Sequence, residues 1–255
     1  MKEISSRNNP EYKALVRLKK RKYRDREEAF LVEGPVVLEE ALAAGVLPKA
    51  LYYQKGKDFP GLRTLAQGRG IPWVALEEDL FLGLSDTVHP QGVLGLFPSP
   101  IKDFSRGPLR GKWLYSDGVQ NPANLGGMIR SLEAFGFSGL LLGPGTVDVL
   151  NPKVVRGTMA SIFRVPIYRI GDKELFGQID QNVALYTLDL GSKIRPQDLG
   201  GQEDLILAVG NEAGGIRQDL NQRAKAIISI PMGGQVDSLN ANVAASIAMY
   251  LLGGD

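Results

Sequence analysis

Residues 205–216 read Leu-Ile-Leu-Ala-Val-Gly-Asn-Glu-Ala-Gly-Gly-Ile, an apolar run that passes directly into a polar, glycine-rich turn. An apolar run of this length is typical of a strand buried on both faces, as strands of parallel sheets are. Similar runs in the second half of the chain begin at Trp113, Leu140, Val183 and Ala226. Segments with helical patterns separate them, so we predict an α/β domain with a mostly parallel sheet.

Two more polar, glycine-bearing turns follow predicted strands, at residues 116–126 and 231–240. Ligands in parallel α/β sheets gather beyond the carboxyl ends of the strands, so these turns are candidates for one ligand site. Taken singly, each turn also has a structural explanation. Asn124 and Ser238 are predicted helix N-caps, and the glycines supply tight turns.

The first half of the chain also alternates strands and helices. Strands are predicted at 30–32, 50–53, 71–75 and 92–97, and helices at 35–44, 61–67 and 77–84. Residues 98–108 then hold three prolines and no periodic pattern, which is typical of a linker. We therefore predict a small α/β domain at 1–97, a linker at 98–109 and a larger α/β domain at 110–255.

A basic block near the start of the chain is a candidate nucleic-acid-binding segment. Between Lys13 and Arg26 the chain carries eight cations and only one acid, Asp25. Such a block can bind a phosphate backbone by releasing its counterions, although a solvated basic helix face has the same composition. The candidate nucleic-acid-binding residues, which the resemblance described below makes candidate RNA-binding residues, are Lys13, Arg17, Lys19, Lys20, Arg21, Lys22 and Arg24.

The composition excludes several kinds of chemistry. The chain has no Cys, so thiolate nucleophiles and Cys-based zinc sites are absent, and its one His, His89, lies in a turn-like stretch. We expect no metal site. Neither a P-loop nor a Gly-x-Gly-x-x-Gly dinucleotide motif occurs. With no apolar run long enough for a bilayer and no secretory signal, we expect a cytoplasmic protein without a membrane partner.

At the three turns the sequence resembles the SpoU/TrmH family of the SPOUT methyltransferases. The family's first motif, Asn-x-x-Asn-x-Gly-x-x-x-Arg, is matched by Asn121, Asn124, Gly126 and Arg130. The second motif, Gly-Asn-Glu-x-x-Gly, is matched at 210–215, and the third by Ile230-Pro-Met and Ser238-Leu-Asn. One departure is that Ala241-Asn242 follows where the family usually continues with Val.

The first half resembles the small substrate-binding domain of ribosomal-RNA members, which is similar to kink-turn-binding ribosomal proteins. Asn9-Pro, the basic segment, Phe30-Leu-Val-Glu-Gly and Pro90-Gln-Gly-Val carry this resemblance. Transfer-RNA members often lack the domain, so the resemblance favours ribosomal RNA as the substrate. A transfer-RNA 2′-O-methyltransferase, a SPOUT enzyme that methylates a base and a catalytically silent RNA-binding protein remain as alternatives.

The resemblance implies transfer of a methyl group from S-adenosylmethionine to a ribose 2′-hydroxyl, most simply in 23S ribosomal RNA. It further implies a homodimer and a trefoil knot, which composition and periodicity would not suggest because knots are rare. The implied cofactor-binding residues are Gly210, Asn211, Ile230, Met232 and Leu239. The implied catalytic residues are Arg130, which we expect beside the reacting ribose, and Asn124, Glu212, Ser238 and Asn240.

Overall fold

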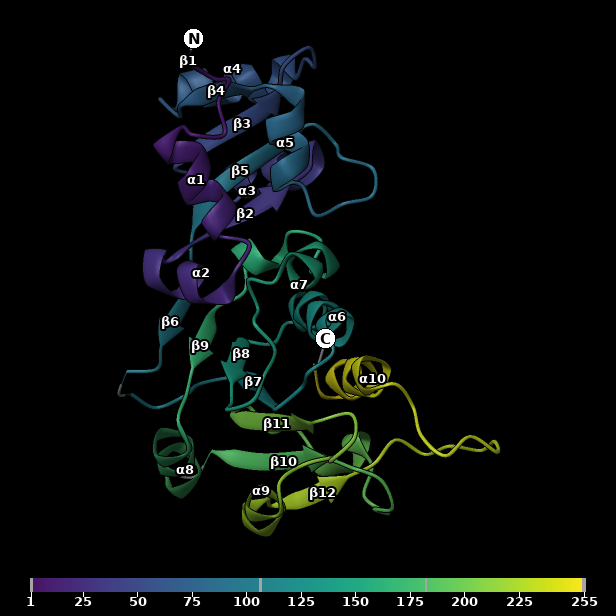
Figure 1. The fold of residues 1–255 in the computed structure, drawn as a ribbon. Helices are drawn as coiled ribbons and strands as arrows, with labels where there is room; N and C mark the ends of the chain where they lie inside the picture. The colour runs from purple at the N-terminus through teal and green to yellow at the C-terminus, as the bar shows by residue number, and fades with distance from the viewer. Residues whose placement is uncertain (1, 106, 182, 254–255) are drawn as a thin grey trace. The chain divides into compact units, whose positions relative to one another are not determined.

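The computed structural model describes residues 2–105, 107–181 and 183–253. The chain divides into two compact units. Unit 1 comprises Met1–Ser99 and Leu150–Phe163, and unit 2 comprises Pro100–Val149 and Arg164–Asp255 (Figure 1). Within the described ranges, no helix is both long enough and apolar enough to cross a membrane.

Unit 1 is built on a five-stranded mixed sheet with the order β1-β4-β3-β5-β2. Its strands are β1 (Lys2–Ile4), β2 (Ala29–Glu33), β3 (Ala50–Gln54), β4 (Trp73–Leu76) and β5 (Val93–Pro98). Strands β1, β4 and β3 are parallel, whereas β5 is antiparallel to both β3 and β2. The periodicity predicted four of these strands; β1, with only three residues, was not predicted.

The helices of unit 1 complete an α/β domain. They are α1 (Pro10–Arg17), α2 (Arg21–Glu27), α3 (Pro35–Ala43), α4 (Pro60–Gly68), α5 (Glu78–Leu84) and α7 (Pro152–Gly157). Tyr12 of α1 and Phe81 of α5 share one apolar core with Tyr52 of β3. Helix α7 is followed by a short 3-10 helix, η1 (Ser161–Phe163), and it packs near β2.

The segment at 150–163 belongs to unit 1 although it lies inside the predicted second domain. Its last residue explains this placement, because the ring of Phe163 lies 4.7 Å from that of Phe97 and 6.2 Å from that of Phe30. The predicted linker also differs from a purely irregular segment. Ile101–Asp103 forms strand β6, which pairs with a strand of unit 2.

Unit 2 contains a seven-stranded sheet with the order β12-β10-β11-β7-β8-β9-β6. Its other strands are β7 (Lys112–Asp117), β8 (Gly139–Leu142), β9 (Ile167–Arg169), β10 (Ala184–Leu188), β11 (Leu205–Gly210) and β12 (Ala226–Ile228). Every pairing between these described strands is parallel. The predicted α/β fold with a mostly parallel sheet is therefore confirmed.

Helices cover the sheet of unit 2. They are α6 (Pro122–Ala134), α8 (Asp172–Asp180), α9 (Gln218–Arg223) and α10 (Ala241–Gly253), with a short 3-10 helix, η2 (Pro196–Leu199). Alternate strand residues such as Tyr115 and Ile206 form one core with Leu175 of α8 and Leu220 of α9. Helix α10 packs against α6 and also contacts β10 and β11 (Figure 1).

An Asn-Pro pair begins three of the helices. The side chains of Asn9, Asn121 and Asn151 accept hydrogen bonds from backbone amides in the first turn, and a proline follows each of them. The predicted N-cap at Asn124 is therefore wrong: Asn121 caps α6, and Asn124 lies buried inside the helix. Its side chain is thereby left for tertiary contacts.

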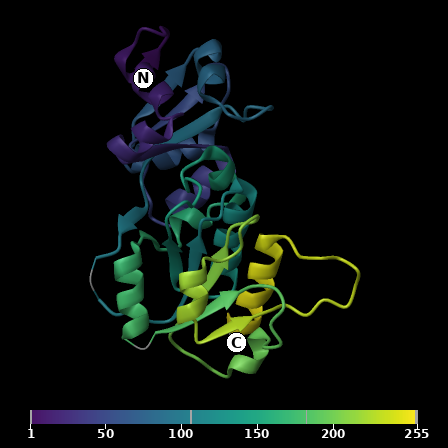
Figure 2. The ribbon, with the colours of Figure 1, turned by 60° about the horizontal axis from the view of Figure 1, so that its bottom comes forward.

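The predicted N-cap of the last helix is also displaced. Helix α10 begins at Ala241, and the side chain of Asn240, not Ser238, accepts hydrogen bonds from the amides of Asn242 and Val243. Ser238 instead belongs to the long loop between β12 and α10. Figure 2 shows this loop, at the yellow end of the colour scale, extending outward before α10.

Candidate functional site

The first two predicted turns begin side by side at the centre of the unit 2 sheet. Strands β7 and β11 are neighbours, and their register pairs Val209 with Ser116 and Gly210 with Asp117. The turns at 118–121 and 211–215 therefore leave the same edge of the sheet. This is the edge at which parallel α/β proteins bind their ligands.

Glu212 links these two turns. Its carboxylate accepts hydrogen bonds from the amides of Gln120 and Asn121, each at 3.1 Å, and from Asn124 Nδ2 at 2.8 Å. Partial burial raises the pKa of the Glu212 carboxyl, but these hydrogen bonds favour the charged form and the net shift is downward. The carboxylate is consequently a charged acceptor on which the start of α6 is fixed.

Asn124 extends this connection to the third turn. While its Nδ2 donates to Glu212, its Oδ1 accepts a 2.9 Å hydrogen bond from Asn240 Nδ2. Asn240 in turn caps α10 through its own Oδ1. The three motif turns, far apart in the sequence, are thus joined by a chain of side-chain hydrogen bonds through Asn240, Asn124 and Glu212.

The second turn has a fixed internal geometry. Asn211 Nδ2 donates to the carbonyl of Gly118 at 2.9 Å, and Asn211 Oδ1 accepts from the amides of Ala213 and Gly214. The backbones of Asn211 and Gly215 also exchange two hydrogen bonds. Gly210 is required for this closure, because a Cβ there would lie 2.3 Å from the carbonyl group of Gly215.

An ion-pair cluster behind the turn was not found by sequence reasoning. Arg217 donates to both oxygens of buried Asp117, through its amide at 2.9 Å and its Nε at 2.8 Å. It also forms a two-pronged pair with Asp172, with distances of 3.0 and 2.8 Å. These bonds raise the pKa of Arg217 and lower that of Asp172. An acid that ends an apolar strand, as Asp117 does, was the available signal.

A cavity of about 610 Å³ opens beyond the carboxyl ends of β10, β11 and β12. Its walls include all the predicted cofactor-binding residues, Gly210, Asn211, Ile230, Met232 and Leu239, together with Glu212, Ser238 and Asn240. Leu188 to Leu190, after β10, complete one wall. The volume lies within the range of small-molecule and cofactor sites.

The other two predicted catalytic residues lie outside the cavity lining. Asn124 is buried in α6 behind Glu212, and Arg130 is exposed on the third turn of α6. Two residues near Arg130 face α10. The hydroxyls of Ser131 and Ser246 share a hydrogen bond of 2.7 Å, and a Cβ on Gly127 would clash with the side chain of Asn242. Asn242, one of the two residues at which the sequence departs from the third family motif, thus fills the space that a side chain at position 127 would need.

The basic block of unit 1 lies on α1, on α2 and on the connection between them, and six of its seven candidate residues are exposed. They are Lys13, Arg17, Lys19, Lys20, Arg21 and Lys22. Arg24 differs, since it is only 5% exposed and its Nη1 donates to the carbonyls of Leu18 and Lys19 at 2.7 and 2.9 Å. It therefore lies inside the corner between α1 and α2, and not on the exposed face predicted for it.

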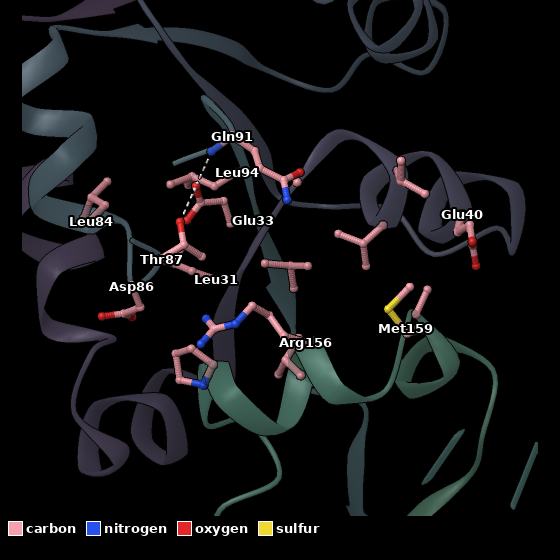
Figure 3. A pocket seen from close by; sticks show the side chains of 17 residues that line it. Leu31, Glu33, Glu40, Leu84, Asp86, Thr87, Gln91, Leu94, Arg156 and Met159 are labelled. Atoms are coloured by element: carbon pink, nitrogen blue, oxygen red, sulfur yellow. Dashed lines mark hydrogen bonds between the residues drawn. The ribbon is translucent and has the colours of Figure 1, made fainter. Parts of the chain in front are cut away.

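Unit 1 also contains a cavity of about 370 Å³ between β2, α3 and α7. Figure 3 shows Glu33 on its wall, held by hydrogen bonds from Thr87 and from the amide of Gln91, with Arg156 extending from α7. Ser85 also donates to Glu33, at 2.7 Å. The acid is fully engaged in anchoring the loop at 85–91. In the part of the chain that the structure describes, no group of three or more acidic or His side chains is arranged to hold a metal.

Comparison with known proteins agrees with this arrangement. Residues 112–250 match the SpoU rRNA Methylase family, and residues 9–95 match the MRM3-like substrate binding domain. RlmP of Bacillus subtilis, a 23S rRNA (guanosine(2553)-2′-O)-methyltransferase, is 32% identical over 100% of both chains. A 23S rRNA (uridine(2479)-2′-O)-methyltransferase of Streptomyces viridochromogenes is 28% identical, covering 98% of this chain and 91% of that one.

Solved structures give the same result. An AdoMet-bound rRNA methyltransferase from Sinorhizobium meliloti superposes with a TM-score of 0.87 and 28% identity, covering 98% of this chain and 97% of the other. Fold and site together define the class, an α/β protein whose ligand cavity lies beyond the carboxyl ends of parallel strands. The chain belongs to the SpoU rRNA Methylase family. The resemblance seen in the three motifs is therefore confirmed.

Proposed function

We propose that the protein methylates a ribose 2′-hydroxyl of 23S ribosomal RNA, with S-adenosylmethionine as the methyl donor. The observation that supports this best is the chain of side-chain hydrogen bonds through Asn240, Asn124 and Glu212, which joins the three motif turns beside a cavity that two of them line. RlmP and the Streptomyces viridochromogenes relative, both named as 23S rRNA 2′-O-methyltransferases, match nearly the whole chain. The Sinorhizobium meliloti relative binds the same donor.

The cavity has the chemistry to hold such a donor. Ile230, Met232 and Leu239 supply apolar walls, while the turn at 210–215 supplies backbone carbonyl acceptors for a nucleoside. The charged Glu212 carboxylate at the same cavity favours a cationic ligand. When bound, S-adenosylmethionine supplies an electrophilic methyl group on a sulfonium centre.

The remaining task of the site is to align the ribose oxygen and remove its proton. We assign Arg130 to the RNA side of the reaction, where it clamps the phosphate beside the reacting ribose and stabilises the developing alkoxide. To act as the base, Arg130 would first have to lose a proton, and a guanidinium is too weak an acid to do so. The proton of the ribose hydroxyl therefore passes to phosphate or water. Asn124, Glu212 and Asn240 keep the three turns in register, and Ser238 supplies a hydroxyl at the cavity wall.

We assign RNA binding to residues 1–97 and methyl transfer to residues 110–255, joined through 98–109. The exposed cations Lys13, Arg17, Lys20 and Lys22 support the first assignment because they can neutralise phosphates. A ribosomal-RNA substrate also favours a cytoplasmic location. Both assignments rest on the matches of residues 9–95 and 112–250 to two separate families.

We further propose that the protein is a homodimer with a knotted unit 2. Helix α10 is apolar almost throughout, yet Val243 and Tyr250 are 44% and 67% exposed. An apolar helix face of this kind requires a partner surface, and a second copy of the chain provides one. The knot is proposed because the chain belongs to the SpoU rRNA Methylase family, the resemblance that implied it.

The test is direct identification of the product. Ribosomal RNA without the modification is incubated with the protein and labelled S-adenosylmethionine, digested to nucleosides and analysed by mass spectrometry. We expect one 2′-O-methylated nucleoside from 23S RNA. A base-methylated nucleoside, or methylation of transfer RNA alone, would contradict the proposal. Absence of S-adenosylmethionine binding in calorimetry would identify a catalytically silent RNA-binding protein.

A further inference from the structure

The corner between α1 and α2 in unit 1 is rigidly built. Helix α1 ends at Arg17 and α2 begins at Arg21, so only three residues connect them. The buried Arg24 side chain fixes this connection by donating to the carbonyls of Leu18 and Lys19. Side chains that project from the corner are therefore held in a constant relation to one another.

Three cations gather around one aromatic ring at this corner. The Cζ atoms of Arg17 and Arg26 lie 5.8 and 5.0 Å from the centroid of the Tyr23 ring, and Lys22 Nζ lies 5.0 Å from it. Each distance is within the range of a cation–π interaction, about 6 Å. Three like charges around one ring repel one another, and the negative ring face partly offsets that repulsion.

The charges at this corner are only partly neutralised by the protein. Arg26 pairs with Glu27 through an exposed contact, which costs little to break. In the described segments, neither Arg17 nor Lys22 forms an ion pair with a carboxylate. The corner thus presents concentrated positive charge, with two cations available and a third easily released.

We propose that Tyr23 organises Arg17, Lys22 and Arg26 into a receptor for one backbone phosphate of the RNA substrate. The inference rests on the proposed function, because it names the RNA contact of the same protein. The ring holds the three cations together before the RNA arrives, so little side-chain entropy is lost when a phosphate binds. On an ordinary solvated helix face, the cations would not be gathered around one aromatic ring.

The experiment compares Tyr23→Leu with Tyr23→Phe in the full chain. Affinity for a 23S RNA fragment is measured at several salt concentrations for each variant. Tyr23→Leu removes the ring and should weaken binding about five- to tenfold, with the slope of log affinity against log salt reduced by about one. Tyr23→Phe keeps the ring face and should retain the affinity and slope of the unchanged protein.

Two measurements keep the test specific. The midpoint of denaturant unfolding of unit 1 should be nearly equal in all variants and shows that the domain carrying Tyr23 is folded. Arg63→Ala, which removes one exposed Arg of unit 1 paired with Asp58, serves as the matched charge control and should leave affinity nearly unchanged.

The outcomes separate this inference from the proposed function. If the unchanged protein binds the RNA and Tyr23→Leu binds it equally well, the phosphate receptor is overturned alone. Weaker binding by Tyr23→Leu with an unchanged salt slope would also overturn it, in favour of a base stacked on the ring. If the unchanged protein binds no RNA, the receptor and the proposed RNA substrate fail together.

Discussion

Asn124 Nδ2 donates a 2.8 Å hydrogen bond to Glu212 Oε1 and thereby joins two turns that lie 88 residues apart in the chain. Because Asn124 also accepts from Asn240, its amide group contacts both of the other motif turns. An Asp at this position could accept from Asn240 but could not donate to Glu212. The requirement for both a donor and an acceptor therefore explains an amide here.

Replacing the acceptor should loosen the site without unfolding the protein. Glu212→Gln removes the charge and weakens the hydrogen bonds from Gln120, Asn121 and Asn124. Hydrogen bonds to charged groups contribute about 1.5–3 kcal/mol each, and the exposure of Glu212 reduces this contribution, so we expect the affinity for S-adenosylmethionine to fall about tenfold. Calorimetric titration with S-adenosylmethionine measures this. Affinity equal to that of the unchanged protein would remove Glu212 from the site.

Two glycines of unit 2 offer a matched pair. In Gly210→Ala the new Cβ would lie 2.3 Å from the backbone of Gly215, so the turn has to open. Gly233→Ala lies in the long loop after β12 and meets nothing within 4 Å. We expect Gly210→Ala to abolish donor binding and Gly233→Ala to retain it, as measured by calorimetry. Equal binding by both variants would show that the tight turn at 210–215 is not needed.

Arg130 should affect turnover more than donor binding. It is exposed on α6 and does not line the cavity, so Arg130→Ala should leave the affinity for S-adenosylmethionine within about twofold while lowering the methylation rate at least about 100-fold. Single-turnover assays on bound RNA measure the rate. Arg110→Ala, which removes another exposed Arg of unit 2, is the control. Near-normal turnover in Arg130→Ala would exclude Arg130 from the mechanism.

The lowered pKa of Glu212 gives stability a defined pH dependence. A carboxyl whose folded-state pKa lies below its ordinary value of 4.5 stabilises the fold fully above that value. The stabilisation is lost as the pH falls through the folded-state pKa. The difference in unfolding free energy between the unchanged protein and Glu212→Gln should therefore be constant from neutral pH down to about 5.5 and shrink below about 4.5. Denaturant unfolding at each pH tests this, and a difference that grew on acidification would contradict it.

The ion pairs of Arg217 should contribute unequally to stability. Arg217→Ala leaves Asp117, whose side chain is 2% exposed, without its cationic partner and with only the amide of residue 217 as donor, and we expect a loss of about 2–3 kcal/mol. Asp172→Asn breaks only the outer pair, where the Asp172 side chain is 41% exposed, and should cost less than about 1 kcal/mol. Urea unfolding gives both values. Equal costs would mean that burial of Asp117 is not what makes the pair important.

The parallel sheet and the site loops were predictable because their signals are local. Apolar runs such as Leu205–Gly210 indicate strands buried on both faces, and the polar turns that follow them mark the edge where ligands bind. Strands β1, β6 and β9 were missed, since three residues are too few to show a period. Strand β12 is equally short, but it was predicted because its apolar run continues in the sequence to Ile230. The Asn-Pro pair at Asn121 marked the start of α6 correctly, but the prediction placed the cap three residues later.

The missed contacts depend on tertiary structure. Nothing in the sequence around Arg24 separates it from its exposed neighbours, yet the fold buries it to close the corner of α1 and α2. Arg217 and Asp117 are 100 residues apart and meet only because β7 and β11 are neighbours. Likewise, a pattern of residues along the chain cannot reveal that Phe163 joins the rings of Phe30 and Phe97.

The strand order of unit 2 also affects how the chain folds during translation. Strand β11 lies between β7 and β10, so one edge of β7 stays without its partner until about 90 further residues have left the ribosome. At about 5–20 residues per second, this edge is open for about 5–20 s. Nascent chains from which Leu205 has not yet left the ribosome should therefore be cut by protease near β7. Chains from which Gly210 has emerged should resist cleavage there. Slower translation between β7 and β11 leaves the edge of β7 exposed for longer, and an exposed edge can pair with a wrong strand. The rate of translation over this segment should therefore affect how much folded protein is obtained.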